Sequence, residues 1–242
     1  MKIGIVGIII ALTFAIAPAF ASDTDADALL RSARGSFDEG DFEGAEEALK
    51  RALDVTSSDA RKNSACLQNI AFMEFMNFNF SESEKFYEKA LPFTTQAAGD
   101  DSLELANNLF GLSRSMRRQN KLAEAEPILQ RIASIRIKQL GDEHRLVSNS
   151  YFDLAVNCDR LGKTPEAINY YAKTLCIREK LFGKSSKALT GLLESYCAAL
   201  KKTNDFKTCD EMAKRLDVVR SNDANESVPA KEADGNGWID IQ

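Results

Sequence analysis

The sequence has little of what most enzymes and metal proteins need. Its 242 residues include one histidine, His144, and no pair of cysteines or histidines at the short spacings that bind zinc. The glycine-rich signatures that hold nucleotide phosphates are missing, and so is the G-x-S-x-G turn of serine hydrolases. These absences predict that the protein is not an enzyme and that it holds no metal and no cofactor.

Proline, glycine and excess positive charge are also scarce. Five prolines and thirteen glycines in the whole length argue against collagen-like and low-complexity classes. The formal net charge is −5, whereas nucleic-acid binding needs clustered lysine and arginine to meet phosphates. No segment alternates apolar and polar residues as a half-buried strand does. The composition therefore predicts a helical protein with no nucleic-acid partner.

The first 21 residues have the three parts of a secretory signal peptide. Lys2 is the only charged residue before Asp23, an apolar run covers residues 3–17, and Ala19-Phe20-Ala21 follows Pro18. We expect cleavage after Ala21, which would leave a periplasmic or secreted protein with no membrane segment. The alternative is an uncleaved anchor, because the apolar stretch approaches the ~20 residues that span a bilayer.

A weak motif recurs five times along the chain. Its anchor positions are 38, 42, 42 and 42 residues apart, and a small residue follows three positions after each. Apolar residues at gaps of three and four precede and follow each anchor, as on two successive helices. Such periods indicate stacked supersecondary units, here helical hairpins. The anchors are Phe42, Phe80, Leu122, Thr164 and Phe206.

These segments resemble the tetratricopeptide repeat, and the 42-residue period with the connector at 137–144 resembles its kinesin-light-chain variety. The resemblance implies an all-α, right-handed superhelical solenoid of about five antiparallel hairpins over residues 22–220. Residues 221–242 are polar and are expected to form a disordered tail. Phe110-Gly111 and Phe152-Asp153 replace the family's asparagine pair, so peptide specificity is not carried over. The expected units are 25–58, 60–101, 102–143, 144–185 and 186–217.

The resemblance also implies that the first helix of each pair lines a concave groove. Aromatic and arginine side chains dominate binding energy at interfaces, and a basic cluster attracts an acidic segment of a protein partner. Alternatively, the phenylalanines pack between repeats and the arginines pair with nearby acids. By repeat phase, Gln68 faces the groove, and Phe110 and Phe152, 42 residues apart, are expected to stack as a ladder. The predicted binding residues of the groove are Phe72, Phe75, Met76, Phe110, Arg114, Arg117, Arg118, Phe152 and Arg160.

The five cysteines leave at least one thiol unpaired within the chain. In tetratricopeptide-like hairpins, the positions of Cys197 and Cys209 face each other where the helices cross, so the two could form a disulfide. The alternative is a pair of small core residues. Cys66, Cys158 and Cys176 are expected in the core.

Two functions remain open at the level of the sequence. The first is an exported adaptor that binds a partner peptide in its groove. The second is a structural subunit of an extracytoplasmic assembly, joined through its end caps and tail. Trp238, the only tryptophan, is either a stray aromatic in the tail or part of a short docking motif.

Overall fold

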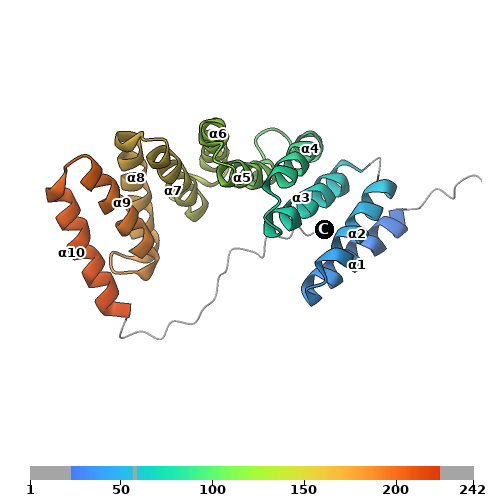
Figure 1. Ribbon diagram of the computed structural model, residues 1–242, viewed down its shortest axis with the longest axis horizontal. Coiled ribbons are helices and arrows are strands. Elements are labelled where there is room, and N and C mark those ends of the chain that lie inside the picture. The colour runs from blue at the N-terminus through green and yellow to red at the C-terminus, as the bar shows by residue number, and fades with distance from the viewer. Residues whose placement is uncertain (1–22, 57–58, 224–242) are drawn as a thin grey trace, which may run out of the picture.

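The computed structural model describes residues 23–56 and 59–223, and these residues form a row of helices without a strand (Figure 1). The predicted signal peptide lies outside the described residues, as does the predicted tail beyond Asp223. The helices are α1 (Asp23–Glu39), α2 (Phe42–Val55), α3 (Ala60–Met76), α4 (Phe80–Ala98), α5 (Leu103–Arg118), α6 (Leu122–Leu140), α7 (Arg145–Arg160), α8 (Thr164–Phe182), the short 3-10 helix η1 (Lys187–Leu189), α9 (Thr190–Lys202) and α10 (Phe206–Asp223).

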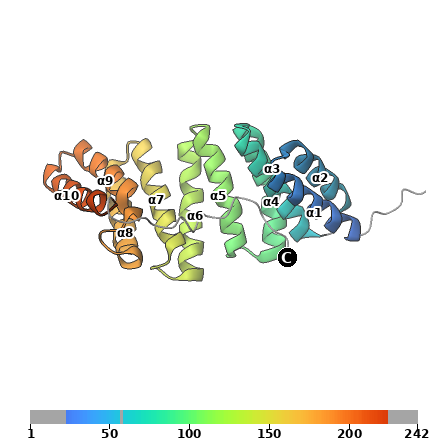
Figure 2. The ribbon, with the colours of Figure 1, turned by 90° about the horizontal axis from the view of Figure 1, so that it is seen from below.

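Each helix packs against the next one in the chain, which gives five hairpins joined side by side (Figure 2). The hairpins form an arch in which α3, α5, α7 and α9 lie on the inside and α4, α6, α8 and α10 on the outside (Figure 1). Contacts between α3 and α5, and between α7 and α9, join the inner layer directly. This arrangement confirms the predicted all-α repeat solenoid.

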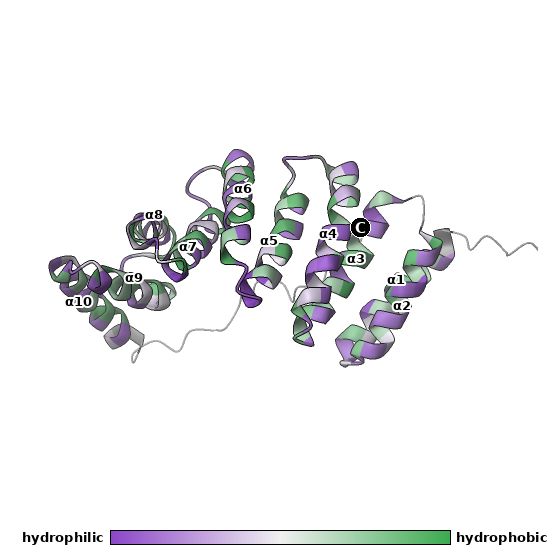
Figure 3. Cartoon of the chain, turned by 45° about the horizontal axis from the view of Figure 1, so that its top comes forward, coloured by the Kyte–Doolittle hydropathy of each residue, from purple (hydrophilic) through white to green (hydrophobic). Residues whose placement is uncertain are grey.

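Apolar and polar residues alternate around each helix (Figure 3), so that each helix buries one stripe against its neighbours. The largest cluster joins α7, α8, α9 and α10 and includes Tyr171, Leu192 and Leu193. The small residues after the anchors are fully or almost fully buried where the hairpin helices cross. Among the described helices, none is both long enough and apolar enough to span a membrane.

One turn recurs in all five hairpins, and a second recurs in three of the connectors between units. The residue that ends each hairpin turn has a positive φ, and it is Gly40, Phe78, Asn120, Gly162 or Asn204. The connectors between units begin at Gly99, Gly141 and Gly183, also at positive φ. Ser102, His144 and Ser186, each 42 residues apart, then accept a backbone N–H of the following helical turn. The histidine is therefore a helix cap.

Ion pairs fasten successive units at equivalent positions. Lys121 Nζ lies 2.8 Å from Glu84, and Lys163 Nζ lies 2.6 Å from Glu126. The hydrogen bond to Glu84 raises the pKa of Lys121, and that to Glu126 raises the pKa of Lys163. Individual exposed pairs add little stability, but their repetition fixes the register of one hairpin on the next.

Three placements made from the sequence differ from the structure. Gln68, which the repeat phase also put in the groove, is buried and donates to Ser64 Oγ at 2.8 Å. Cys176, expected in the core, is exposed on α8. Helix α10 continues to Asp223, past the expected start of the tail at Ser221. The first two differences are phase errors, because adjacent residues of a helix face in different directions.

Candidate protein-binding surface

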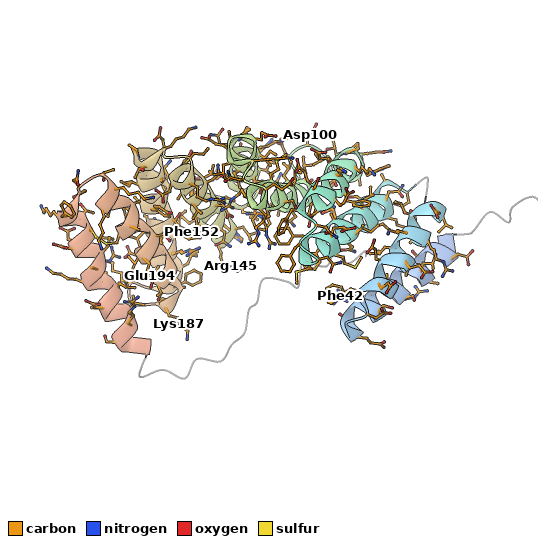
Figure 4. The ribbon with its side chains drawn as sticks, in the orientation of Figure 1. Phe42, Asp100, Arg145, Phe152, Lys187 and Glu194 are labelled. Atoms are coloured by element: carbon orange, nitrogen blue, oxygen red, sulfur yellow. A yellow bond between two sulfur atoms is a disulfide. The ribbon has the colours of Figure 1, made fainter. Side chains whose placement is uncertain are left out.

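The inner layer of the arch carries an aromatic and basic surface, which we call the inner surface. In Figure 4, Phe152 of α7 and Glu194 of α9 lie on this side, whereas Asp100, in the α4–α5 connector, lies on the outer side. The side chains that define the inner surface are exposed or half-buried. They are Phe75, Met76, Asn107, Phe110, Arg114, Arg118, Phe152 and Arg160.

In the third and fourth units, a phenylalanine of the inner helix that belongs to this surface lies against an arginine of the outer helix. In the third unit the guanidinium of Arg136 lies 5.4 Å from the centre of the Phe110 ring. In the fourth unit, 42 residues on, Arg178 lies 5.1 Å from the Phe152 ring. Arg136 and Arg178 also donate to the next inner helix or its connector, to Ser150 Oγ at 3.0 Å and to Ala188 O at 3.3 Å.

The second and fifth units replace this stacked pair by polar pairs. Gln68 and Thr94 occupy the positions in the second unit, with 3.5 Å between Gln68 Nε2 and Thr94 Oγ1. Glu194 and Arg220 occupy them in the fifth, as an ion pair of 2.6 Å. Aromatic rings on the inner surface are therefore confined at this position to the two central units.

Two arginines of α5 cover aromatic rings of the second unit. The guanidinium of Arg114 lies 4.5 Å from the centre of the Phe75 ring and 5.6 Å from that of Phe110. Arg118 lies 4.9 Å from the Phe80 ring. Cation–π contacts hold an arginine in place without neutralising its charge. Within the described part of the chain, neither Arg114 nor Arg118 makes an ion pair, so both charges face solvent.

Arg117 and Arg160 both form polar contacts with a neighbouring repeat. Arg117 Nη1 lies 2.7 Å from Asp153 Oδ1 of the next unit, and both side chains are mostly covered. Arg160 donates to the carbonyl oxygen of Arg117 and to Asn120 Oδ1, both at 3.3 Å. For Arg117, the structure agrees with the alternative stated from the sequence, in which the arginine pairs with a nearby acid.

The phenylalanines predicted to line the groove also make contacts within and between the repeats. Phe72 is half-buried against Phe37 of the first unit, with 6.1 Å between ring centres. Phe152 packs edge-on to Tyr171 at 6.0 Å. Among the described residues no ring contact joins Phe110 to Phe152, and an arginine of the same unit lies over each ring. The structure thus replaces the expected ladder of stacked phenylalanines by separate ring–arginine pairs.

Sequence reasoning missed Phe78, which lies at the α3–α4 turn. Its φ is 63°, and 72% of its surface is exposed, the largest value among the exposed apolar residues of the described chain. The signal was available in the sequence, since glycine or asparagine stands at the equivalent position of each other unit. Phe78 joins the inner surface through Phe80, whose ring contacts those of both Phe78 and Phe75.

The last hairpin is cross-linked. Cys197 of α9 and Cys209 of α10 form a disulfide with their Cα atoms 4.7 Å apart. Cys66 and Cys158 are buried free thiols, and burial raises the pKa of Cys66 to about 12. The buried thiols are therefore protonated and unreactive near neutral pH.

The inner surface offers apolar contacts and positive charge. Burial raises the pKa of Tyr87 and of Tyr171 to about 12, so both phenols are neutral near neutral pH. Across residues 23–56 and 59–223, no group of three or more potential ligand side chains could hold a metal ion. Exposed aromatics beside unpaired arginines are suited to binding another polypeptide.

Comparison with known proteins supports this interpretation. A sequence profile described as "Tetratricopeptide repeat" matches residues 63–138 and, overlapping them, 116–180. None of the curated proteins is similar in sequence.

Solved structures resemble the chain over most of its length. BtubC (BKLC) from P. vanneervenii superposes with a TM-score of 0.72 at 17% identity, covering 93% of this chain and 100% of that one. A putative kinesin light chain from Podosopora anserina, with nearly identical TPR-like repeats, gives 0.71 at 15% identity, covering 85% and 99%. MamA protein gives 0.66 at 16% identity, covering 87% and 100%. At such low identity these likenesses show the fold.

Proposed function

Because the chain belongs to the tetratricopeptide-repeat proteins, with repeats of the kinesin-light-chain-like variety, we propose that it is an exported adaptor that holds an acidic segment of a partner protein on its inner surface. Repeats of this class act as protein-interaction scaffolds. The export part of the proposal is supported by the signal-like residues 1–21 of the sequence.

The observation that carries the proposal is the pair of unpaired arginines on α5. Arg114 and Arg118 are held over aromatic rings, at 4.5 and 4.9 Å, in a protein whose net charge is −5. Positive charge that the fold does not neutralise favours an approaching carboxylate. The adjacent rings of Phe75 and Phe110 supply apolar contact for the same segment.

The test is affinity capture of partners from the extracytoplasmic fraction with the mature chain. Arg114→Glu/Arg118→Glu should reduce capture of a specific partner by about tenfold or more, and added salt should weaken capture by the unmodified chain. The matched control is Lys207→Glu/Lys214→Glu, which changes the charge equally on exposed positions of α10. Equal capture by both variants would contradict the proposal. Arg117 is unsuitable for this test, because its charge reversal would also break the pair with Asp153.

A second candidate function is favoured by the exposed apolar residues of the last hairpin. Phe206 is 58% exposed and Val218 50% exposed on α10, and within residues 23–56 and 59–223 no further repeat packs on this helix. A subunit joined to another chain through this end would bury them. If so, Phe206→Ser/Val218→Ser should dissociate the assembly in analytical ultracentrifugation, whereas Arg114→Glu/Arg118→Glu should leave it intact.

A further inference from the structure

Phe78 combines two unfavourable features that a purely structural residue would not need. Its φ of 63° places it in the left-handed region, where a bulky side chain is strained. The same side chain is 72% exposed, so packing within the described chain compensates for only a small part of the strain. Glycine or asparagine fills the position in the other units without this difficulty. A strained residue that persists without packing indicates a functional surface.

Phe78 belongs to a contiguous aromatic patch, which we call the turn patch. The Phe78 ring centre lies 6.1 Å from that of Phe80, and Phe80 lies 5.3 Å from Phe75. Met76, 51% exposed, ends the helix beside them. Arg114 and Arg118 cover the rings of Phe75 and Phe80 and carry the charges described above. The turn patch therefore fits an apolar side chain next to a carboxylate.

The chain itself contains a segment with this chemistry, among the residues that lie outside the described part. Residues 232–241 carry Glu232, Asp234 and Asp240 and no basic residue. They also carry Trp238, Ile239 and Ile241, the kind of large apolar side chains that an aromatic patch takes up. The charge is complementary to that of Arg114 and Arg118.

The length of the connecting chain permits this contact within one molecule. Fifteen residues lead from Asp223 to Trp238, and a stretched chain of that length spans at most about 50 Å. Packed helices are about 10 Å apart, and α9, α7 and α5 are the inner helices between α10 and the turn patch. The end of α10 and the α3–α4 turn both face the open side of the arch (Figure 1).

We propose that residues 232–241 dock on the turn patch of their own chain, with Trp238 against Phe78 and Met76 and the acidic side chains near Arg114 and Arg118. This inference rests on the proposed function, because each of the two proposals requires this surface to bind a polypeptide segment. It adds an internal occupant, which a partner protein would have to displace.

The single tryptophan makes the test direct, because the fluorescence of the full chain reports only on Trp238. Docking predicts emission at shorter wavelength than free tryptophan, low quenching by acrylamide, and no dependence on protein concentration. Phe78→Asn and Arg118→Ala should each move the emission to the wavelength of water-exposed tryptophan. Phe206→Ala, which removes an exposed aromatic at the far end, should leave it unchanged.

A readout of stability separates docking from a structural role of Phe78. Asparagine occupies the same turn position in two other units, so Phe78→Asn should raise the midpoint of thermal unfolding by about 2–4 °C while it releases the tryptophan. Water-exposed emission in the unmodified chain overturns the inference. Buried emission that Phe78→Asn leaves unchanged also overturns it. Emission that shifts on dilution overturns docking within one molecule and assigns the segment to a second copy. Partner capture that still depends on Arg114 and Arg118 would leave the proposed function standing in each case.

Discussion

Gly111→Ala should lower the free energy of unfolding by about 3 kcal/mol, although alanine is the better helix former. A Cβ atom at Gly111 would lie 2.2 Å from Cζ of Tyr87 and 2.7 Å from its hydroxyl oxygen. Tyr87 is only 8% exposed between α4 and α5, so its ring has no free space into which to move. The two helices would have to separate at the centre of the arch. Chemical denaturation followed by circular dichroism measures the loss.

Two further variants show whether the clash is the cause. Gly191→Ala is the matched control, because a Cβ atom on this helical glycine of α9 would have nothing within 4 Å. It should stabilise the chain by about 0.5–1 kcal/mol. Tyr87→Leu should restore part of the stability lost in Gly111→Ala, which a double-mutant cycle would report as coupling. Similar effects of alanine at both glycines would contradict this packing.

Reduction of the disulfide between Cys197 and Cys209 should destabilise the last hairpin by about 3 kcal/mol, the effect expected for a loop of this size. The bridge joins α9 to α10 across 12 residues, and α10 packs almost entirely on α9 and η1. Within the described part of the chain no further repeat packs on α10, so the cross-link supplies a restraint that packing on a neighbour would otherwise give. Hydrogen exchange in α9 and α10 should rise in Cys197→Ser/Cys209→Ser, while that in α5 and α6 stays unchanged.

The free thiols supply the control for that experiment. An alkylating reagent at pH 8 should modify the exposed Cys176 in the native protein. It should leave Cys66 unmodified, because burial raises the pKa of that thiol to about 12. Loss of α10 protection after alkylation without reduction would show that modification of a free thiol, and not reduction of the bridge, destabilises the hairpin.

The architecture could be predicted because its signals repeat. Anchors 42 residues apart, with small residues three positions later, fix the phase of two helices in each unit. Because the pattern repeats, a unit with a weak pattern is assigned from the others. Glycine and asparagine before the anchors mark turns that need a positive φ, and the structure has such a φ at each of these positions. The string of helical hairpins followed from this periodicity, and the resemblance of the same segments to the tetratricopeptide repeat implied the solenoid.

Individual side-chain contacts were less predictable, because they depend on which repeat comes next. Arg117 and Arg118 are adjacent in sequence, yet one reaches Asp153 of the following unit and the other lies on Phe80 of the preceding unit. The ring–arginine pairs of Phe110 and Phe152 involve a residue 26 positions further along the chain, on the other helix of the hairpin. Phe78 was missed because it departs from the glycine or asparagine that marks this turn in the other four units.

The inner surface is tested most directly by site-specific photo-crosslinking in the extracytoplasmic fraction. A photoreactive residue at Asn107, exposed on α5 beside Phe110, is compared with one at Gln130, exposed on the outer helix α6. We expect a specific adduct from position 107 that Arg114→Glu/Arg118→Glu abolishes, and none from position 130. The same adduct from position 130 alone would contradict binding on the inner surface.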